Sequence, residues 1–151
     1  MSIEKDIQQA KFRNDYQKAV INIIYTYNWV MEQNKKFFDK GDITPQQFNI
    51  LRILRGAGKP ISTLQIRQRM LDKMSDTSRI VDRLLKKELV KKVICESDRR
   101  LVDVTITDKG MELLHKLDNY NDELDALFSN ISDEEAKQLN NLLDKVRRSE
   151  S

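Results

Sequence analysis

The sequence has little of what disulfide-linked, zinc-binding or membrane-spanning proteins require. Its 151 residues include one cysteine and one histidine. One cysteine excludes an internal disulfide and fits a reducing cytosol, and the two residues are too few for a usual structural zinc site. Apolar runs are only a few residues long, which excludes a hydrophobic membrane helix. The charged N-terminal stretch MSIEKDIQQAKFRND lacks the apolar core of a secretory signal, so we expect a cytoplasmic protein.

Catalytic motifs are equally scarce. The loop Gly56-Ala57-Gly58-Lys59 has the wrong spacing for a phosphate-binding loop, and no strand precedes it. His115 has no nearby nucleophile or metal-ligand partner in the sequence. We therefore expect neither an enzyme nor a cofactor. Cys95 is most simply a small buried apolar residue, and a redox switch is the alternative.

Charge, by contrast, is abundant and unevenly distributed. Charged residues make up 34% of the chain, for a net charge of +3. Residues 52–110 hold 15 basic and 8 acidic side chains, a net charge of +7, whereas residues 111–151 have a net charge of −5. A basic central segment indicates a polyanionic partner, for which double-stranded DNA is the leading candidate.

Apolar residues recur at helical spacing in both outer parts of the chain. The pattern predicts one long helix over residues 7–40, ending near Gly41. A further helix is expected to begin at the cap Thr107 and to continue to Phe128. Ser132 and Glu135 predict a capping box for the last helix. These helices carry more apolar surface than a small central unit can cover, so we expect a homodimer.

The central segment predicts two short helices joined by a tight turn. Thr44, Pro45 and Gln47 mark one helix start, and Ser62 with Gln65 marks the next. The helix from Ser62 is short, and the following helix ends near Lys87. Such a pair is typical of a helix-turn-helix motif, with an ordinary helical hairpin as the alternative. The apolar residues are Leu64, Ile66 and Met70 on the first of the two, and Thr77, Ile80, Val81 and Leu84 mark the buried face of the second.

Two strands, Leu89–Cys95 and Leu101–Ile106, form a predicted β-hairpin after this motif. The tip carries Asp98, Arg99 and Arg100. A hairpin in this position is a wing, and the narrow minor groove of A·T-rich DNA favours an inserted guanidinium. Asp98 would hold the Arg100 side chain in one orientation and so reduce the entropy lost on binding. The alternative is a solvated tip with a weak surface ion pair.

At these residues the sequence resembles the MarR (multiple-antibiotic-resistance regulator) family of winged helix-turn-helix regulators. RIVDRLLKKELV (79–90) and SDRRLVDVTITDKG (97–110) are similar to its recognition helix, its Asp-Arg-Arg wing and the following helix start. The resemblance implies that Asp98 orients Arg100, that Arg100 enters a groove and that Arg99 is a second basic contact. It also implies a dimer formed by the outer helices and a small-molecule pocket.

Two residues depart from the family pattern. Glu88 occupies the position of a usual glycine, so a left-handed backbone there would cost about 1–2 kcal/mol. Asp76 lies near the start of the recognition helix, which is unusual beside DNA phosphates. It would either stabilise the helix N-terminus or accept from a cytosine amino group.

The face opposite the buried one predicts the DNA contacts. Arg79 would bind a guanine edge or a phosphate, with an ion pair to Asp82 or Asp76 as the alternative. Arg83 would bind a phosphate or form an internal ion pair. The full set on the recognition helix is Ser75, Asp76, Ser78, Arg79 and Arg83. Candidate contacts to the DNA backbone are Ser62, Thr63 and Gln65, and the aromatic residues expected to line a pocket for a small aromatic effector are Tyr25, Trp29 and Phe48.

The sequence thus predicts a mainly α protein with a small antiparallel β-hairpin, forming one winged helix-turn-helix domain over residues 1–151. Residues 44–106 would bind DNA, and the helices of 1–43 and 107–151 would form the dimer. We expect a sequence-specific, ligand-responsive repressor that binds a pseudo-palindromic operator. The alternatives are a ligand-insensitive architectural DNA binder and a winged-helix protein-interaction module.

Overall fold

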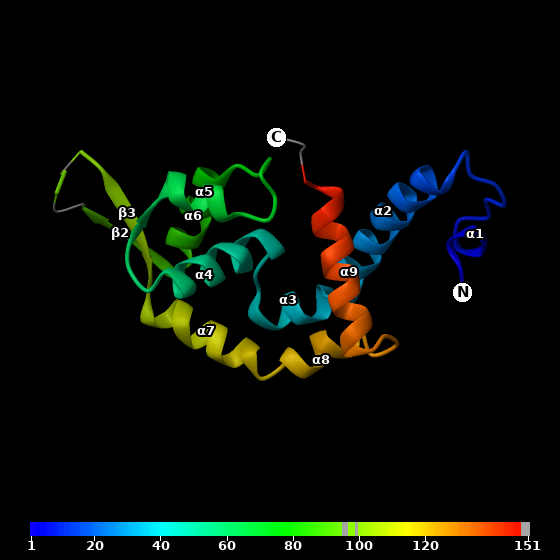
Figure 1. Ribbon diagram of the computed structural model, residues 1–151. Helices are drawn as coiled ribbons and strands as arrows, with labels where there is room; N and C mark the ends of the chain where they lie inside the picture. Colours follow the sequence, from blue (N-terminus) through cyan, green and yellow to red (C-terminus); the bar gives the residue numbers. More distant parts are fainter. Residues whose placement is uncertain (95–96, 99, 149–151) are drawn as a thin grey trace. The chain divides into compact units, whose positions relative to one another are not determined.

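The structure is a computed structural model that describes residues 1–94, 97–98 and 100–148 (Figure 1). Cys95, Glu96 and Arg99 lie outside the described residues, so the roles considered for Cys95 and Arg99 stay predictions. The chain divides into two compact units. One is 34–120, and the other joins 1–33 to the segment that begins at Asn121. No helix in the described residues combines the length and apolar character needed to span a membrane.

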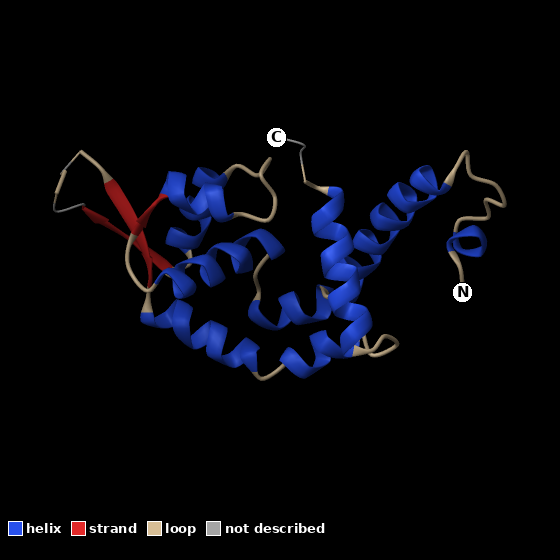
Figure 2. Cartoon of the chain, viewed as in Figure 1, coloured by secondary structure: helices blue, strands red, loops and turns tan. Residues whose placement is uncertain are grey.

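The unit of residues 34–120 contains the predicted winged helix-turn-helix. Its sheet has three antiparallel strands in the order β1-β3-β2 (Figure 2). The fold class is therefore confirmed: a mainly α protein with a small antiparallel sheet. The elements are α3 (Lys35–Gly41), α4 (Pro45–Ala57), β1 (Ile61–Ser62), α5 (Thr63–Arg69), α6 (Thr77–Lys86), β2 (Val90–Ile94), β3 (Val102–Ile106) and α7 (Asp108–Asp118).

Side-chain caps fix the helix starts in this unit. The Thr44 hydroxyl accepts from the Gln47 backbone N–H at 3.1 Å, and the Gln47 side chain accepts from the Thr44 N–H in return. Ser62 and Gln65 form the same reciprocal pair at the start of α5. Each box satisfies two backbone donors that a helix start leaves unpaired. These helix starts are confirmed.

The core of this unit lies between α4, α5, α6, α7 and the sheet. Ile66 of α5 and Met70, which directly follows this helix, are buried, whereas Leu64 of α5 is 64% exposed. Val81 and Leu84 supply the buried face of α6. Because these side chains hold α6 by one face, its opposite face is left in solvent.

Strand β1 was not predicted, because it has only two residues. It pairs with β3 so that Ile61 lies opposite Val104, and both side chains are buried. Strands β2 and β3 form the wing in the register Val90 opposite Ile106 through Ile94 opposite Val102. β1 therefore adds a third strand to the base of the predicted hairpin, next to the start of α5.

The prediction of one helix over residues 7–40 is wrong. Gln8 has a left-handed backbone with φ 53°, and α2 begins only at Asp15. The Asn14 side chain caps α2 by accepting from the Gln17 N–H at 2.8 Å. Asn34 then separates α2 from α3. The elements of this second unit are α1 (Ile3–Asp6), α2 (Asp15–Gln33), α8 (Asn121–Ala126) and α9 (Asp133–Val146).

The predicted continuous helix from Thr107 to Phe128 is also interrupted. Thr107 caps α7 as expected, accepting from the Gly110 N–H at 3.1 Å. α7 ends at Asp118, and the Tyr120 N–H turns back to the Leu117 carbonyl. The sequence DNYND at this point is rich in poor helix formers, which explains the break.

Glu88 adopts the left-handed conformation that was considered for it from the sequence, with φ 62°. The Leu89 N–H donates to the Leu84 carbonyl at 3.1 Å, and the Glu88 N–H donates to the Leu85 carbonyl at 3.0 Å. These two bonds are those of a Schellman motif, which normally has glycine at the left-handed position. The motif ends α6 and directs the chain into β2.

We expect Glu88→Gly to stabilise the protein by about 1 kcal/mol. Relief of the left-handed strain contributes about 1–2 kcal/mol, and the added freedom of the unfolded chain removes part of that gain. Glu88 and Lys109 are both exposed and 4.0 Å apart, so losing that pair has little effect. Chemical denaturation measures the change.

Glu88→Ala is the matched control, because it removes the same charge and keeps the strained backbone. It should leave the free energy of unfolding nearly unchanged. Equal stabilisation by alanine and glycine would show that the side chain of Glu88, and not its backbone, is unfavourable.

Candidate nucleic-acid interface

The turn between α5 and α6 encloses a hollow of about 490 Å³. It brings together residues from the start of α5 and the start of α6, which are about a dozen positions apart in the sequence. Four of the predicted DNA contacts lie here: Thr63, Ser75, Asp76 and Ser78. The other lining residues are Leu64, Arg67, Met74 and Thr77.

Backbone anchors set the shape of this turn. The Leu71 N–H donates to the Asn49 side chain of α4 at 2.9 Å. The Asp72 carboxylate accepts from the Met74 N–H at 2.9 Å, and the Ser75 hydroxyl donates to the Asp72 carbonyl at 2.7 Å. Ser75 is therefore a turn residue in the first place. Its half-buried hydroxyl oxygen can still accept a hydrogen bond from a DNA group.

The predicted contact face of α6 is open to solvent. Ser78, Arg79 and Arg83 are all exposed. Asp82, one alternative partner of Arg79, is instead 4.0 Å from Lys92 of β2. Within the described part of the chain, neither Arg79 nor Arg83 forms an ion pair. Both guanidinium groups are thus available to an external anion.

Asp76 is the N-cap of α6. Its carboxylate accepts from the Arg79 backbone N–H at 3.2 Å. The first of the two roles considered for it, stabilising the helix N-terminus, is confirmed. The carboxylate is exposed and keeps further accepting capacity, so a contact with cytosine stays a prediction.

The three candidate contacts to the DNA backbone at the start of α5 differ in whether their side chains are already used in the helix cap. The Ser62 and Gln65 side chains bind each other's backbone in the capping box. Thr63 lines the hollow with a half-buried side chain. The structure adds Arg67, which is exposed and lies one turn after Thr63. The spacing of four residues between Thr63 and Arg67 is the sequence signal that could have identified it.

The wing confirms the predicted pairing of Asp98 with Arg100. The Arg100 Nε and Nη2 atoms donate to Asp98 Oδ1 and Oδ2 at 3.0 and 3.1 Å, a two-point contact. The Arg100 backbone N–H also donates to Oδ1 at 3.1 Å. The Arg100 side chain is 90% exposed, whereas that of Asp98 is 32% exposed. The carboxylate thus fixes the orientation of a guanidinium that lies almost wholly in solvent.

This contact lowers the pKa of Asp98 below its usual value of 3.8, mainly because the charged Arg100 side chain donates to the carboxylate. The same hydrogen bonds raise the pKa of the Arg100 guanidinium. A depressed carboxyl pKa means that the contact is fully present above pH 3.8 and is lost as the pH falls through the lowered value. The Asp98 carboxylate therefore fixes the orientation of the Arg100 side chain throughout the physiological pH range.

We expect the Asp98 carboxyl to titrate below pH 3.8 in the folded protein, and Arg100→Ala to return it towards 3.8. A ¹³C NMR titration of the side-chain carboxyl measures both values. A wild-type pKa at or above 3.8 would contradict the two-point contact in solution.

The three residues predicted to line an effector pocket fall in both units. Tyr25 and Trp29 lie on α2, each 39% exposed. Phe48 of α4 packs edge to face against Phe37 and Phe38, with ring centroids 5.3 and 5.6 Å away. Phe48 therefore has a structural role in the unit of residues 34–120, and the shared pocket stays a prediction.

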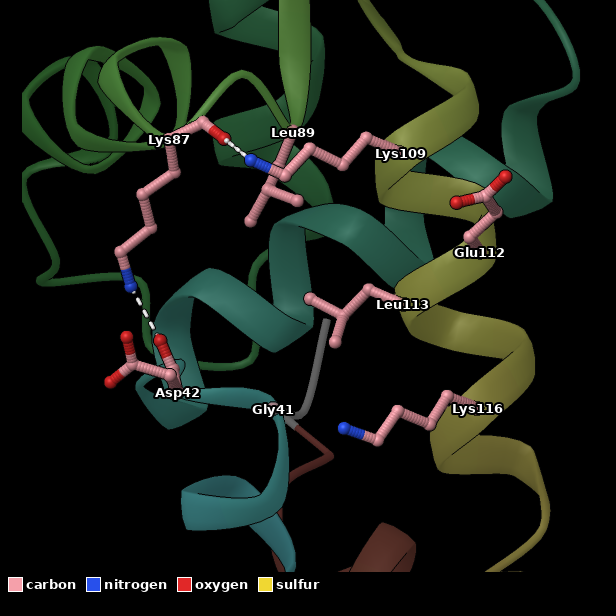
Figure 3. Close-up of a pocket in the computed structure, with 8 residues that line it drawn as sticks. All are labelled: Gly41, Asp42, Lys87, Leu89, Lys109, Glu112, Leu113 and Lys116. Atoms are coloured by element: carbon pink, nitrogen blue, oxygen red, sulfur yellow. Dashed lines mark hydrogen bonds between the residues drawn. The ribbon is translucent and has the colours of Figure 1, made fainter.

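A second hollow, of about 410 Å³, lies at the C-terminal end of α6 (Figure 3). Lys87, Leu89 and Asp42 lie on one side of it, and α7 forms the other side (Figure 3). Lys109 donates to the Lys87 carbonyl at 3.0 Å, and Lys87 donates to the Asp42 carbonyl at 2.5 Å. These two lysines therefore tie the end of α6 to α7 and to the end of α3.

Comparison with known proteins finds sequence relatives of this chain. The family model described as "MarR family" matches residues 43–102. The HTH-type transcriptional regulator PecS of Dickeya dadantii is 32% identical over 117 residues, covering 75% of this chain and 70% of PecS. The segment of this chain that the family model matches contains the capped helices, the hollow at the turn between α5 and α6, and most of the wing.

Solved structures agree on the fold. A mutant of MarR from E. coli complexed with operator DNA matches with a TM-score of 0.82 at 23% identity, covering 92% of this chain and all of the other. An organohalide-sensing transcriptional regulator in its 2,4-dichlorophenol-bound form matches with a TM-score of 0.80 at 17% identity, covering 92% and 85%. At these identities the likeness concerns the fold.

Proposed function

The chain belongs to the MarR family of DNA-binding transcriptional regulators and is not an enzyme, and from this premise we propose that it is a ligand-responsive repressor acting in the cytoplasm. It binds a pseudo-palindromic operator as a homodimer. The observation that carries the DNA contacts is the exposed Arg100 guanidinium, oriented by Asp98 on a wing beside an α6 whose own arginines are unpaired within the described residues.

Three groups of side chains make different contacts with the operator. Arg79 and Ser78, near the N-terminal end of α6, read base edges in the major groove. Arg100 enters the adjacent minor groove, and Arg99 is the second basic contact of the wing. Arg83 and Thr63 contact phosphates, which fix the register of the protein on the duplex.

Exposed apolar side chains support the homodimer. α2 has 19 residues and none is buried. Tyr16, Val20 and Tyr27 of this helix are between 56% and 84% exposed, and Leu142 and Val146 of α9 are 61% and 73% exposed. Large apolar side chains exposed in such number on a helix are typical of an interaction site. In a two-fold dimer the two α6 helices bind half-sites about 34–36 Å apart.

The aromatic residues Tyr25, Trp29 and Phe48 stay a set predicted from the sequence. The effector site that the structure supports best is the hollow at the end of α6, where Lys87, Lys109 and Lys116 lie around Leu89 and Leu113. An aromatic acid bound there would contact the segment that ends the recognition helix, which links occupancy to DNA affinity. Operator affinity measured with and without a panel of aromatic acids tests the ligand response.

The experiment that tests the function is selection of bound duplexes from a random pool, followed by a salt titration of the selected site. We expect a two-fold symmetric sequence, and a logarithm of affinity that falls with the logarithm of salt concentration by about 0.9 per phosphate neutralised. Symmetric sites with affinity insensitive to every effector would favour an architectural binder. No enrichment and no salt dependence would favour a protein-interaction module.

A further inference from the structure

The helix-turn-helix exposes two large apolar side chains to solvent at one place. Met74, just before α6, is 93% exposed, and Leu64 of α5 is 64% exposed. Both line the hollow of about 490 Å³ at the turn. Leu64 differs in this from Ile66 of the same helix and from Met70 directly after it, which are both buried in the core. The exposure of Leu64 and Met74 therefore has no explanation in the packing of the unit.

The groups around these two side chains indicate what covers them. Thr63, Arg67 and Ser78 line the same hollow and offer hydrogen-bond donors. The site lies at the N-terminal end of α6, the end of a recognition helix that enters the major groove first. In that groove the base edges are polar with one exception, the C5-methyl group of thymine.

We propose that Leu64 and Met74 contact thymine C5-methyl groups and so specify T·A pairs beside the bases read by Ser78 and Arg79. The inference rests on the proposed function, because it needs α6 to lie in the major groove. Methionine suits the role, since its unbranched side chain adapts to an irregular apolar surface.

A protein partner fits the same place less well. A specific protein interface buries roughly 800 Å² on each partner, and two side chains in a polar hollow do not approach this area. A thymine methyl needs no more than a small apolar contact, which Leu64 and Met74 provide among the polar groups that bind the rest of the base edge.

The test uses the full chain and the duplex selected in the previous experiment, with each thymine replaced in turn by uracil. Uracil lacks the C5-methyl group and keeps every hydrogen-bonding group of the base. At the contacted positions the wild-type affinity should fall about fourfold, or about 0.8 kcal/mol, the value for one buried methyl-sized group. At other positions it should not change.

Variants of similar shape connect the loss to the two side chains. With Leu64→Asn and Met74→Gln combined, the uracil and thymine duplexes should bind equally. Leu71→Asn is the matched control, because Leu71 is 83% exposed but does not line the hollow. This control variant should keep the fourfold difference. Circular dichroism checks that each variant is folded.

Two results would overturn the inference while leaving the proposed function intact. One is wild-type protein that binds the selected site and discriminates nowhere between thymine and uracil. The other is a folded double variant that keeps the full discrimination. Failure of the wild-type protein to bind any duplex would instead reject the proposed function, and this inference with it.

Discussion

Replacing Arg100 with alanine should lower the affinity for the selected operator about tenfold or more and leave the thermal midpoint of unfolding unchanged. The guanidinium is 90% exposed and pairs with the carboxylate of Asp98 two residues away, so the fold does not depend on it. In the proposed complex it would lie in the narrow, strongly negative minor groove, where a hydrogen bond made by a charged group is stronger than one made by a neutral group. Fluorescence anisotropy with labelled duplex measures the affinity.

Three further variants separate charge from orientation. Arg100→Lys keeps the charge and loses the two-point contact, so its affinity should be intermediate. Asp98→Asn keeps the arginine and removes the carboxylate charge, and it should weaken binding less than Arg100→Ala. Arg148→Ala removes the same charge from the C-terminal segment and should have little effect. Loss of thermal stability in step with affinity would show that Arg100 is structural.

The base composition at the wing provides the sharper test. A minor groove rich in A·T pairs is narrow, and replacing those pairs with G·C widens it and lowers its attraction for arginine. The difference between wild type and Arg100→Ala should therefore shrink on a duplex with G·C pairs at the wing positions. An unchanged difference would indicate that Arg100 contacts a phosphate instead.

The features correctly predicted from the sequence are those that neighbouring residues determine. The boxes at Thr44, Ser62 and Ser132 form as expected, because each requires two side chains three positions apart. The pairing of Asp98 with Arg100 is local for the same reason. The capping boxes and this ion pair can therefore be predicted without knowledge of the tertiary fold.

The wrong and missing predictions have two physical causes. In some cases the apolar periodicity continues through a position where polar residues end the helix, as at Asn14 and at the turn after Asp118. Others depend on partners distant in sequence. Strand β1 exists because Ile61 meets Val104, and the exposure of Leu64 depends on how α5 is placed against the core. Neither can be obtained from a local pattern.

Replacing Gly110 with alanine should destabilise the protein by about 1–2 kcal/mol. A Cβ atom at this position would lie 2.4 Å from the Leu89 carbonyl oxygen and 2.6 Å from Ile106 Cγ1. That carbonyl accepts from the Thr107 N–H at 3.1 Å, so it cannot move without disturbing the α7 cap. Overpacking of this kind costs about 1–3 kcal/mol or more, which outweighs the gain of about 1 kcal/mol that alanine gives in a helix.

Gly56→Ala is the matched control, since no atom lies within 4 Å of the Cβ it would add near the end of α4. The same substitution should there stabilise the protein by up to about 1 kcal/mol. Opposite signs in chemical denaturation would show that Gly110 is required by close approach and not by flexibility. Because Leu89 precedes β2 and Ile106 ends β3, the strain at Gly110→Ala falls on the base of the wing. Operator affinity of the folded variant should therefore fall as well, and unchanged affinity would mean that the wing is positioned without α7.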